Sequence, residues 1–106
     1  MTDNGFSARA DGRYDIRGQI TFQTVPQYFS HTPQMLQGGD GPVTIDLAGV
    51  TLADTAGIAL LVEWHQQARA AGRALQFVNI PDQMRKIIYV SSLQHVFLIE
   101  RRKERR

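Results

Sequence analysis

Apolar residues that alternate with polar ones predict a β-hairpin at the start of the chain. The alternation runs on both sides of Asp11-Gly12. An Asp-Gly pair between two such runs is typical of a two-residue hairpin turn, because both central residues of that turn need positive φ angles. We therefore expect strands over about residues 6–10 and 13–18, with Gly18 ending or bending the second strand.

The spacing of apolar residues after the hairpin predicts a short, imperfect helix. Thr24-Val25-Pro26-Gln27 has the form of a capping box, and proline is tolerated in the first turn of a helix. The apolar residues of this segment share one helical face: Val25, Tyr28, Phe29 and Leu36. Pro33 lacks an amide hydrogen, so we expect it to break or kink a helix over about residues 25–37. Gly38-Gly39-Asp40-Gly41 then predicts a flexible loop.

The middle of the chain predicts a central strand, a loop and a long helix. The apolar residues of the strand alternate with polar ones: Val43, Ile45 and Leu47. Residues 48–53 are expected to form a loop that carries Val50 and Leu52. Apolar residues at helical spacing predict a helix over about residues 55–71, with Gly72 as its C-cap.

The remaining pattern adds a strand over residues 75–78 and a helix opened by Pro81 and Asp82. Val96-Phe97-Leu98-Ile99 predicts a last short strand. Strands that alternate with helices after an opening hairpin are typical of an α/β domain with a mixed sheet and helices packed against it.

Length and composition are those of one soluble globular domain. The chain has 106 residues, of which 42% are hydrophobic, and we expect a single domain over residues 1–100. The absence of cysteine excludes disulfides and Cys-based metal sites. We see neither a signal-peptide pattern nor an apolar run long enough to cross a bilayer, so the expected location is the cytoplasm.

The positive net charge belongs to the last six residues. Their cations are Arg101, Arg102, Lys103, Arg105 and Arg106. Without this tail the body of the chain is slightly acidic. The tail is interpreted as a solvated end, or as a contact for an acidic partner surface or anionic lipid headgroups. Nucleic acid is the least favoured partner, because no aromatic residues interleave these cations.

The helix over residues 55–71 has an apolar arc wider than packing on one sheet face requires. The arc contains Ile58, Leu61, Val62, Trp64 and Ala68, with Leu60 and Ala71 on its flank. Two interpretations stay open. The helix is wedged between the sheet and a neighbouring helix, or part of the arc near Ile58 and Val62, or near Leu60 and Trp64, contacts a partner protein.

The start of this helix, Asp54-Thr55-Ala56-Gly57, is the stretch that most resembles a functional site. Asp54 or Thr55 can cap the helix, and the unpaired amides of the first turn favour an anion. Gly57 has no side chain and leaves the first turn accessible. A phosphoryl group on Thr55 would be tolerated by the helix dipole. The four residues alone are also typical of an ordinary helix cap.

No other residues predict catalysis or a cofactor. His31, His65 and His95 have no shared metal-ligand spacing, so no metal site is expected. A Gly-x-Ser-x-Gly elbow is absent, and Gly38–Gly41 lacks the Lys-Ser/Thr of a phosphate-binding loop. We therefore expect a protein that is not an enzyme and carries no cofactor.

The central pattern resembles the STAS domain family, which includes the anti-sigma-factor antagonists. Its residues are Val43–Val50 followed by Asp54–Leu61, and Gly18-Gln19-Ile20 and Asn79-Ile80-Pro81 also match. The resemblance implies a STAS-like mixed sheet. Many antagonists of this family carry Asp-Ser-x-Gly with a phosphorylated serine, and this chain has Thr55 at that place.

Within the family, the run Asp54–Leu61 is most similar to the MlaB type, the cytoplasmic STAS subunit of the Mla ABC transporter, which maintains outer-membrane lipid asymmetry. This resemblance implies a non-enzymatic subunit that binds the transporter's ATPase, peripheral to the inner membrane. The implied partner-binding residues are Asp54, Thr55, Ala56, Gly57, Ile58, Leu61 and Val62. The alternative is an anti-sigma-factor antagonist that binds an anti-sigma kinase and is switched by phosphorylation at Thr55.

Overall fold

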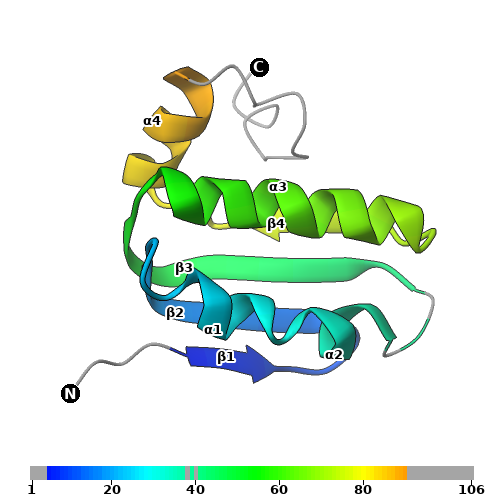
Figure 1. The fold of residues 1–106 in the computed structure, drawn as a ribbon. Coiled ribbons are helices and arrows are strands. Elements are labelled where there is room, and N and C mark those ends of the chain that lie inside the picture. Colours follow the sequence, from blue (N-terminus) through cyan, green and yellow to red (C-terminus); the bar gives the residue numbers. More distant parts are fainter. Residues whose placement is uncertain (1–4, 38, 40, 91–106) are drawn as a thin grey trace, which may run out of the picture.

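The computed structural model describes residues 5–37, 39 and 41–90. The elements of this part follow in order (Figure 1): β1 (Gly5–Ala8), β2 (Arg13–Ile20), α1 (Val25–Phe29), α2 (Thr32–Gln37), β3 (Val43–Ala53), α3 (Thr55–Ala70), β4 (Leu75–Val78) and α4 (Asp82–Val90). The predictions for residues 96–99 and for the basic tail fall outside the described residues.

The strands form one mixed sheet in the order β1-β2-β3-β4. β1 and β2 are an antiparallel hairpin, whereas β2–β3 and β3–β4 are parallel pairs. Helices α1, α2 and α3 lie against one face of the sheet, and α4 lies beside the start of α3 (Figure 1). The predicted mixed α/β architecture is confirmed, as are the strand over residues 75–78 and the helix after Pro81.

The opening hairpin has the turn that its sequence predicts. Asp11 and Gly12 both have positive φ angles, 62° and 75°. Gly18 also has a positive φ, 91°, and the pairing of β2 with β3 shifts register directly after it. β2 nevertheless continues to Ile20, so Gly18 does not end the strand, and the register shift after it fits the alternative prediction of a bend.

The helical segment after β2 is divided at a different residue from the one expected. α1 ends at Phe29, and α2 begins at Thr32, which places Pro33 in the first turn of a new helix. A proline there loses no helical hydrogen bond, so Pro33 does not kink a helix. Thr32 stabilises the junction because its hydroxyl donates to the Phe29 carbonyl at 2.6 Å and accepts from Trp64 Nε1 at 2.8 Å.

β3 is an eleven-residue strand, so the loop predicted over residues 48–53 is wrong. Asp15 pairs with Asp46 but Arg17 pairs with Gly49, which inserts one extra residue in β3. This bulge and a second extra residue between Val50 and Leu52 both change the alternation of buried positions, so the second half of the strand does not show a period-two pattern. The Asp46 carboxylate accepts from the Ala48 amide at 2.9 Å and supports the bulge.

The hydrophobic core lies between the sheet and α3, with α1 and α2 beside it. Its largest fully buried side chains are Trp64, Tyr28, Phe77, Ile16, Ile20, Met35, Ile45, Leu47, Leu61, Met84, Ile88 and Val43. Trp64 comes from α3, while Tyr28 and Met35 come from α1 and α2. The wide apolar arc of α3 is therefore accounted for by a helix wedged between a sheet and neighbouring helices.

The first turn of α3 lies unusually close to the end of β2. The Ile20 carbonyl accepts a hydrogen bond from the Asp54 amide at 3.3 Å. A Cβ atom built on Gly57 would lie only 2.3 Å from the same carbonyl oxygen. The space that a side chain at residue 57 would need is thus filled by the backbone of β2. Gly57 is buried and is not open to a partner.

A buried arginine holds the helical segment against the sheet. Arg73 is only 8% exposed. Its guanidinium donates to the carbonyls of Gly41, Met35 and Leu36 at 2.9–3.1 Å. These bonds satisfy carbonyls at the end of α2 and in the loop before β3, because helix ends leave such groups without intrahelical partners.

None of the helices in the described part of the chain has the length and apolar character needed to cross a membrane.

We predict that Gly57→Ala lowers the free energy of unfolding by about 2–3 kcal/mol, because the new methyl group collides with the Ile20 carbonyl and the backbone must move. Urea titration followed by circular dichroism measures the change. Gly41→Ala is the matched control, since no atom lies within 4 Å of its Cβ position, and its change should stay within about 0.5 kcal/mol. Equal effects of the two substitutions would contradict the close approach.

We predict that Arg73→Met lowers the free energy of unfolding by about 2–3 kcal/mol, because it leaves buried carbonyl groups without a donor. The exposed Arg69 of α3 gives a control with the same change of side chain. A loss of stability from Arg69→Met as large as that from Arg73→Met would show that the carbonyl contacts of Arg73 contribute little.

Candidate functional site

The Asp54 carboxylate joins two segments that are far apart in the sequence. Its Oδ1 atom accepts from the Gly57 amide at 3.1 Å, which caps α3 as the sequence predicts. Its Oδ2 atom accepts from the Phe22 amide, also at 3.1 Å. The loop between β2 and α1 is thereby fixed beside the first turn of α3.

The ionised form of Asp54 is favoured by these contacts. Partial loss of hydration acts to raise the pKa, but hydrogen bonds from the backbone amides of Phe22, Gly57 and Ala56 outweigh it. The pKa of the Asp54 carboxyl group therefore lies below its usual value. The cap is charged at neutral pH and complements the partial positive charge of the helix N-terminus.

Thr55, the predicted phosphoacceptor, is the first residue of α3 and is exposed. Ala56 is half-buried beside it. An added phosphoryl group would gain from the helix dipole and would lie next to the Asp54 charge, which opposes it. The position is open to a partner surface or to a modifying enzyme.

Two of the residues expected to contact a partner belong to the core instead. Ile58 is 3% exposed and Leu61 is completely buried, so their prediction as surface contacts is wrong. Both point into the core because α3 packs on the sheet as well as on α1 and α2. Val62 is half-buried, while Ala59, one turn after Thr55, is exposed.

Two large apolar side chains beside Asp54 were missed by the sequence reasoning. Phe22 is 78% exposed, and its amide is the group bonded to the Asp54 carboxylate. Leu52, two residues before Asp54, is 45% exposed. We call the exposed residues Phe22, Leu52, Thr55 and Ala59 the Thr55 surface. The assignment of residues 48–53 to a loop concealed Leu52, and the position of Phe22 two residues before the N-cap Thr24 was the available sequence signal for Phe22.

Helix α4 is tied to the strand that leads into this surface. The Gln83 side chain donates to the Ala53 carbonyl at 2.7 Å and accepts from the Ala53 amide at 3.0 Å. Ala53 directly precedes Asp54 and ends β3. The two bonds pair the amide and the carbonyl of Ala53, as a neighbouring strand would. They fix the end of β3, which leads into the Thr55 surface.

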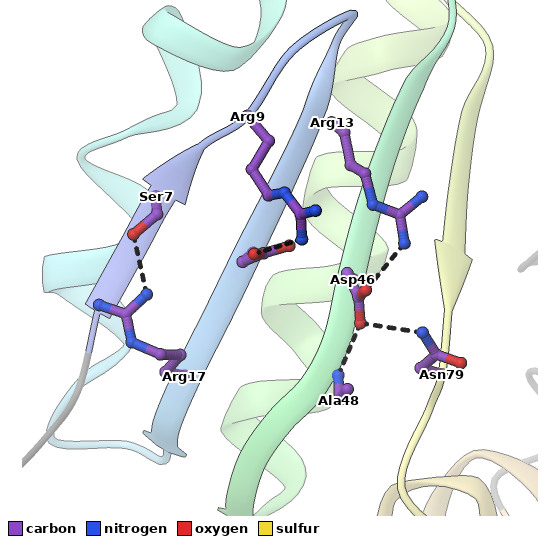
Figure 2. A network of polar contacts seen from close by, with 8 residues as sticks. Ser7, Arg9, Arg13, Arg17, Asp46, Ala48 and Asn79 are labelled. Carbon is purple, nitrogen blue, oxygen red and sulfur yellow. Dashed lines mark hydrogen bonds and ion pairs between the residues drawn. The ribbon is translucent and has the colours of Figure 1, made fainter.

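The other candidate residues have structural contacts. The Asp46 carboxylate binds the side chains of Arg13 and Asn79 at 2.8 and 3.2 Å (Figure 2), and its pKa is lowered because these bonds and the Ala48 amide outweigh the effect of burial. The His31 ring stacks on Phe6. In residues 5–37, 39 and 41–90, no three potential metal ligands of the His, Cys, Asp and Glu types lie together.

The pKa of the His65 side chain is lowered, mainly because the ring is partly buried and also because Arg69 repels its charged form. His95 lies outside the described residues.

Solved structures share this fold. A chain of the Acinetobacter MlaFEDB complex in its ATP-bound conformation is 25% identical, with a TM-score of 0.75 over 87% of this chain and 97% of that one. An anti-sigma factor antagonist from Mycobacterium paratuberculosis is 17% identical, with a TM-score of 0.74 over 93% and 85% of the two chains. The phosphorylated form of the Bacillus cell fate determinant SpoIIAA is also 17% identical, with a TM-score of 0.66 over 92% and 90%.

Sequence comparison identifies the family. No curated protein matches the chain. The family model described as the MlaB STAS domain matches residues 7–100, which include every helix and strand after the first two residues of β1. With the mixed sheet, the capped helix α3 and the structural neighbours above, this match shows that the chain belongs to the MlaB-type STAS domain family.

Proposed function

We propose that this protein is a non-enzymatic accessory subunit that binds the cytoplasmic ATPase of an Mla-type phospholipid-transport ABC transporter. The observation that carries the proposal is the Thr55 surface, where apolar side chains are exposed beside the hydrogen-bonded cap of α3. The family match and the MlaFEDB neighbour support the choice of partner.

The Thr55 surface has the composition of a small protein interface. Phe22 and Leu52 expose apolar area, and aromatic residues are frequent anchors of such interfaces. Thr55 adds an exposed polar residue. The Asp54 bonds to Phe22 and Gly57 order the surface before binding, so little conformational entropy is lost on association.

Under this proposal the protein acts only by binding the ATPase and performs no chemical step. Contacts made with one arrangement of the ATPase and not with another shift the population toward the assembled transporter. The subunit then supports transport by contacting the ATPase and not the transported lipid. Its location is the cytoplasmic side of the inner membrane, where Arg101, Arg102, Lys103, Arg105 and Arg106 would lie close to anionic headgroups.

The second candidate function is that of an anti-sigma-factor antagonist. The observation that favours it is the exposed hydroxyl of Thr55 at the helix N-terminus, the place where the dipole tolerates a phosphoryl group. The partner would be an anti-sigma kinase, and phosphorylation of Thr55 would release the complex. Both functions use the same surface and differ in whether Thr55 is modified.

Purification of the protein from its native cells under mild conditions distinguishes the two functions. The proposal predicts that an ABC ATPase and a permease are recovered with it and that Thr55 is unmodified by mass spectrometry. Recovery of a serine kinase without any transporter subunit would refute the proposal in favour of the antagonist.

We predict that Phe22→Ser weakens binding to the ATPase about 30-fold, the effect of losing one interface anchor worth about 2 kcal/mol. Its side chain is 78% exposed, so the free energy of unfolding should change by less than about 0.5 kcal/mol. Tyr89→Ser on α4 removes a comparably exposed aromatic ring and is the matched control.

Binding of the purified ATPase, measured by surface plasmon resonance, reports the affinities of the two variants. Equal affinities of the Phe22 and Tyr89 variants would show that the ATPase binds elsewhere on the protein.

A further inference from the structure

The face of the sheet that points away from the helices carries three arginines, and two of them are paired. Arg9 binds Asp15 at 3.0 Å, and Arg13 binds Asp46 at 2.8 Å (Figure 2). Asp15 and Asp46 lie directly opposite each other on β2 and β3. Each arginine thus compensates one of two carboxylates that would otherwise repel each other across the strands.

Arg17 is the third arginine, and no carboxylate of the described residues forms an ion pair with it. Its Nη1 atom donates to the Ser7 hydroxyl oxygen at 2.8 Å. Because Ser7 accepts this bond, its own O–H remains able to donate to a further acceptor. The Arg17–Ser7 pair therefore presents guanidinium and hydroxyl donors beside each other.

The position of the Arg17 side chain depends on glycines in both neighbouring strands. Its cross-strand partners are Gly5 in β1 and Gly49 in β3. A Cβ atom on Gly5 would lie 2.2 Å from Nη2 of Arg17, so the guanidinium lies over the backbone of β1. Figure 2 shows Arg17 reaching from β2 across β1 toward Ser7.

β1 is an edge strand of the sheet. Among the described strands it pairs with β2 alone, so its other side offers backbone donors and acceptors to an added strand. Edge strands of this kind bind extended segments of partner proteins, where the backbone gives affinity and alternate side chains give specificity. A cation that lies over the edge selects for an acidic side chain on the incoming strand.

We propose that the free edge of β1 binds an extended acidic segment of a partner protein, with Arg17 and Ser7 holding one of its carboxylates. A guanidinium and a carboxylate form paired, charge-assisted hydrogen bonds. A protein segment fits this edge better than an anionic membrane, because an extended segment has backbone amides and carbonyls that can pair with those of β1, whereas a lipid surface has none. This surface is separate from the Thr55 surface, so the proposal does not depend on the ATPase.

The test uses the full chain and a short peptide in which Glu and Val alternate, so that acidic side chains share one face of an added strand. Fluorescence anisotropy gives its affinity. Amide NMR spectra of the labelled protein locate it. The proposal predicts chemical-shift changes concentrated at Gly5–Ala8 and an affinity about tenfold lower for Arg17→Gln, the effect of losing one charged hydrogen-bond pair.

Matched variants distinguish this site from general charge attraction. Lys86→Gln removes an exposed positive charge from α4 and should bind the peptide as the unmodified protein does. Arg17→Lys keeps the charge but loses the paired geometry, so its affinity should fall between the two. The thermal midpoint of each variant verifies its fold.

The proposal is overturned if the peptide fails to bind, if Arg17→Gln and Lys86→Gln weaken it equally, or if the shifts map away from β1. It is also overturned if vesicles rich in phosphatidylglycerol perturb the β1 amides and the peptide does not. Success or failure of ATPase binding at the Thr55 surface has no bearing on any of these outcomes.

Discussion

The contact between the end of β2 and the first turn of α3 is the constraint on which the rest of the site depends. The Ile20 carbonyl accepts from the Asp54 amide and occupies the space where any side chain at residue 57 would begin. Asp54 can then cap α3 with one carboxylate oxygen and hold Phe22 with the other. Glycine at position 57 is thus needed for packing, and the exposed surface around Thr55 is a consequence of that packing.

Much of the fold could be predicted because local chemistry and global structure agree. Asp11-Gly12 needs positive φ angles and forms the predicted turn, and Asp54 caps α3 as expected. β3 could not be predicted in full, because two extra residues, one at each register shift, change the burial pattern, and only the pairing with β2 shows them. The predicted interruption of the helix is present but lies before Pro33, because a proline within a helical pattern looks the same whether it interrupts one helix or begins the next.

The sequence predicted the helix cap at Asp54 but not which neighbouring side chains are exposed beside it. Ile58 and Leu61 follow the motif on an apolar arc, and a one-dimensional pattern does not say which part of a wide arc is covered by α1 and α2. Burial assigns both residues to the core. Phe22 joins the site through a hydrogen bond that spans thirty-two residues of sequence, and no local pattern carries that information. The resemblance drew attention to the motif, whereas the exposed side chains around it follow from packing that only the structure shows.

The central claim is that the Thr55 surface is the part of this protein that an Mla-type ATPase covers. Hydrogen–deuterium exchange of the subunit, alone and assembled with the ATPase and permease, measures this most directly. The account predicts that protection on assembly is concentrated in residues 20–23 and 52–59, with little change in α4. Protection of α4 without any change around Thr55 would contradict it.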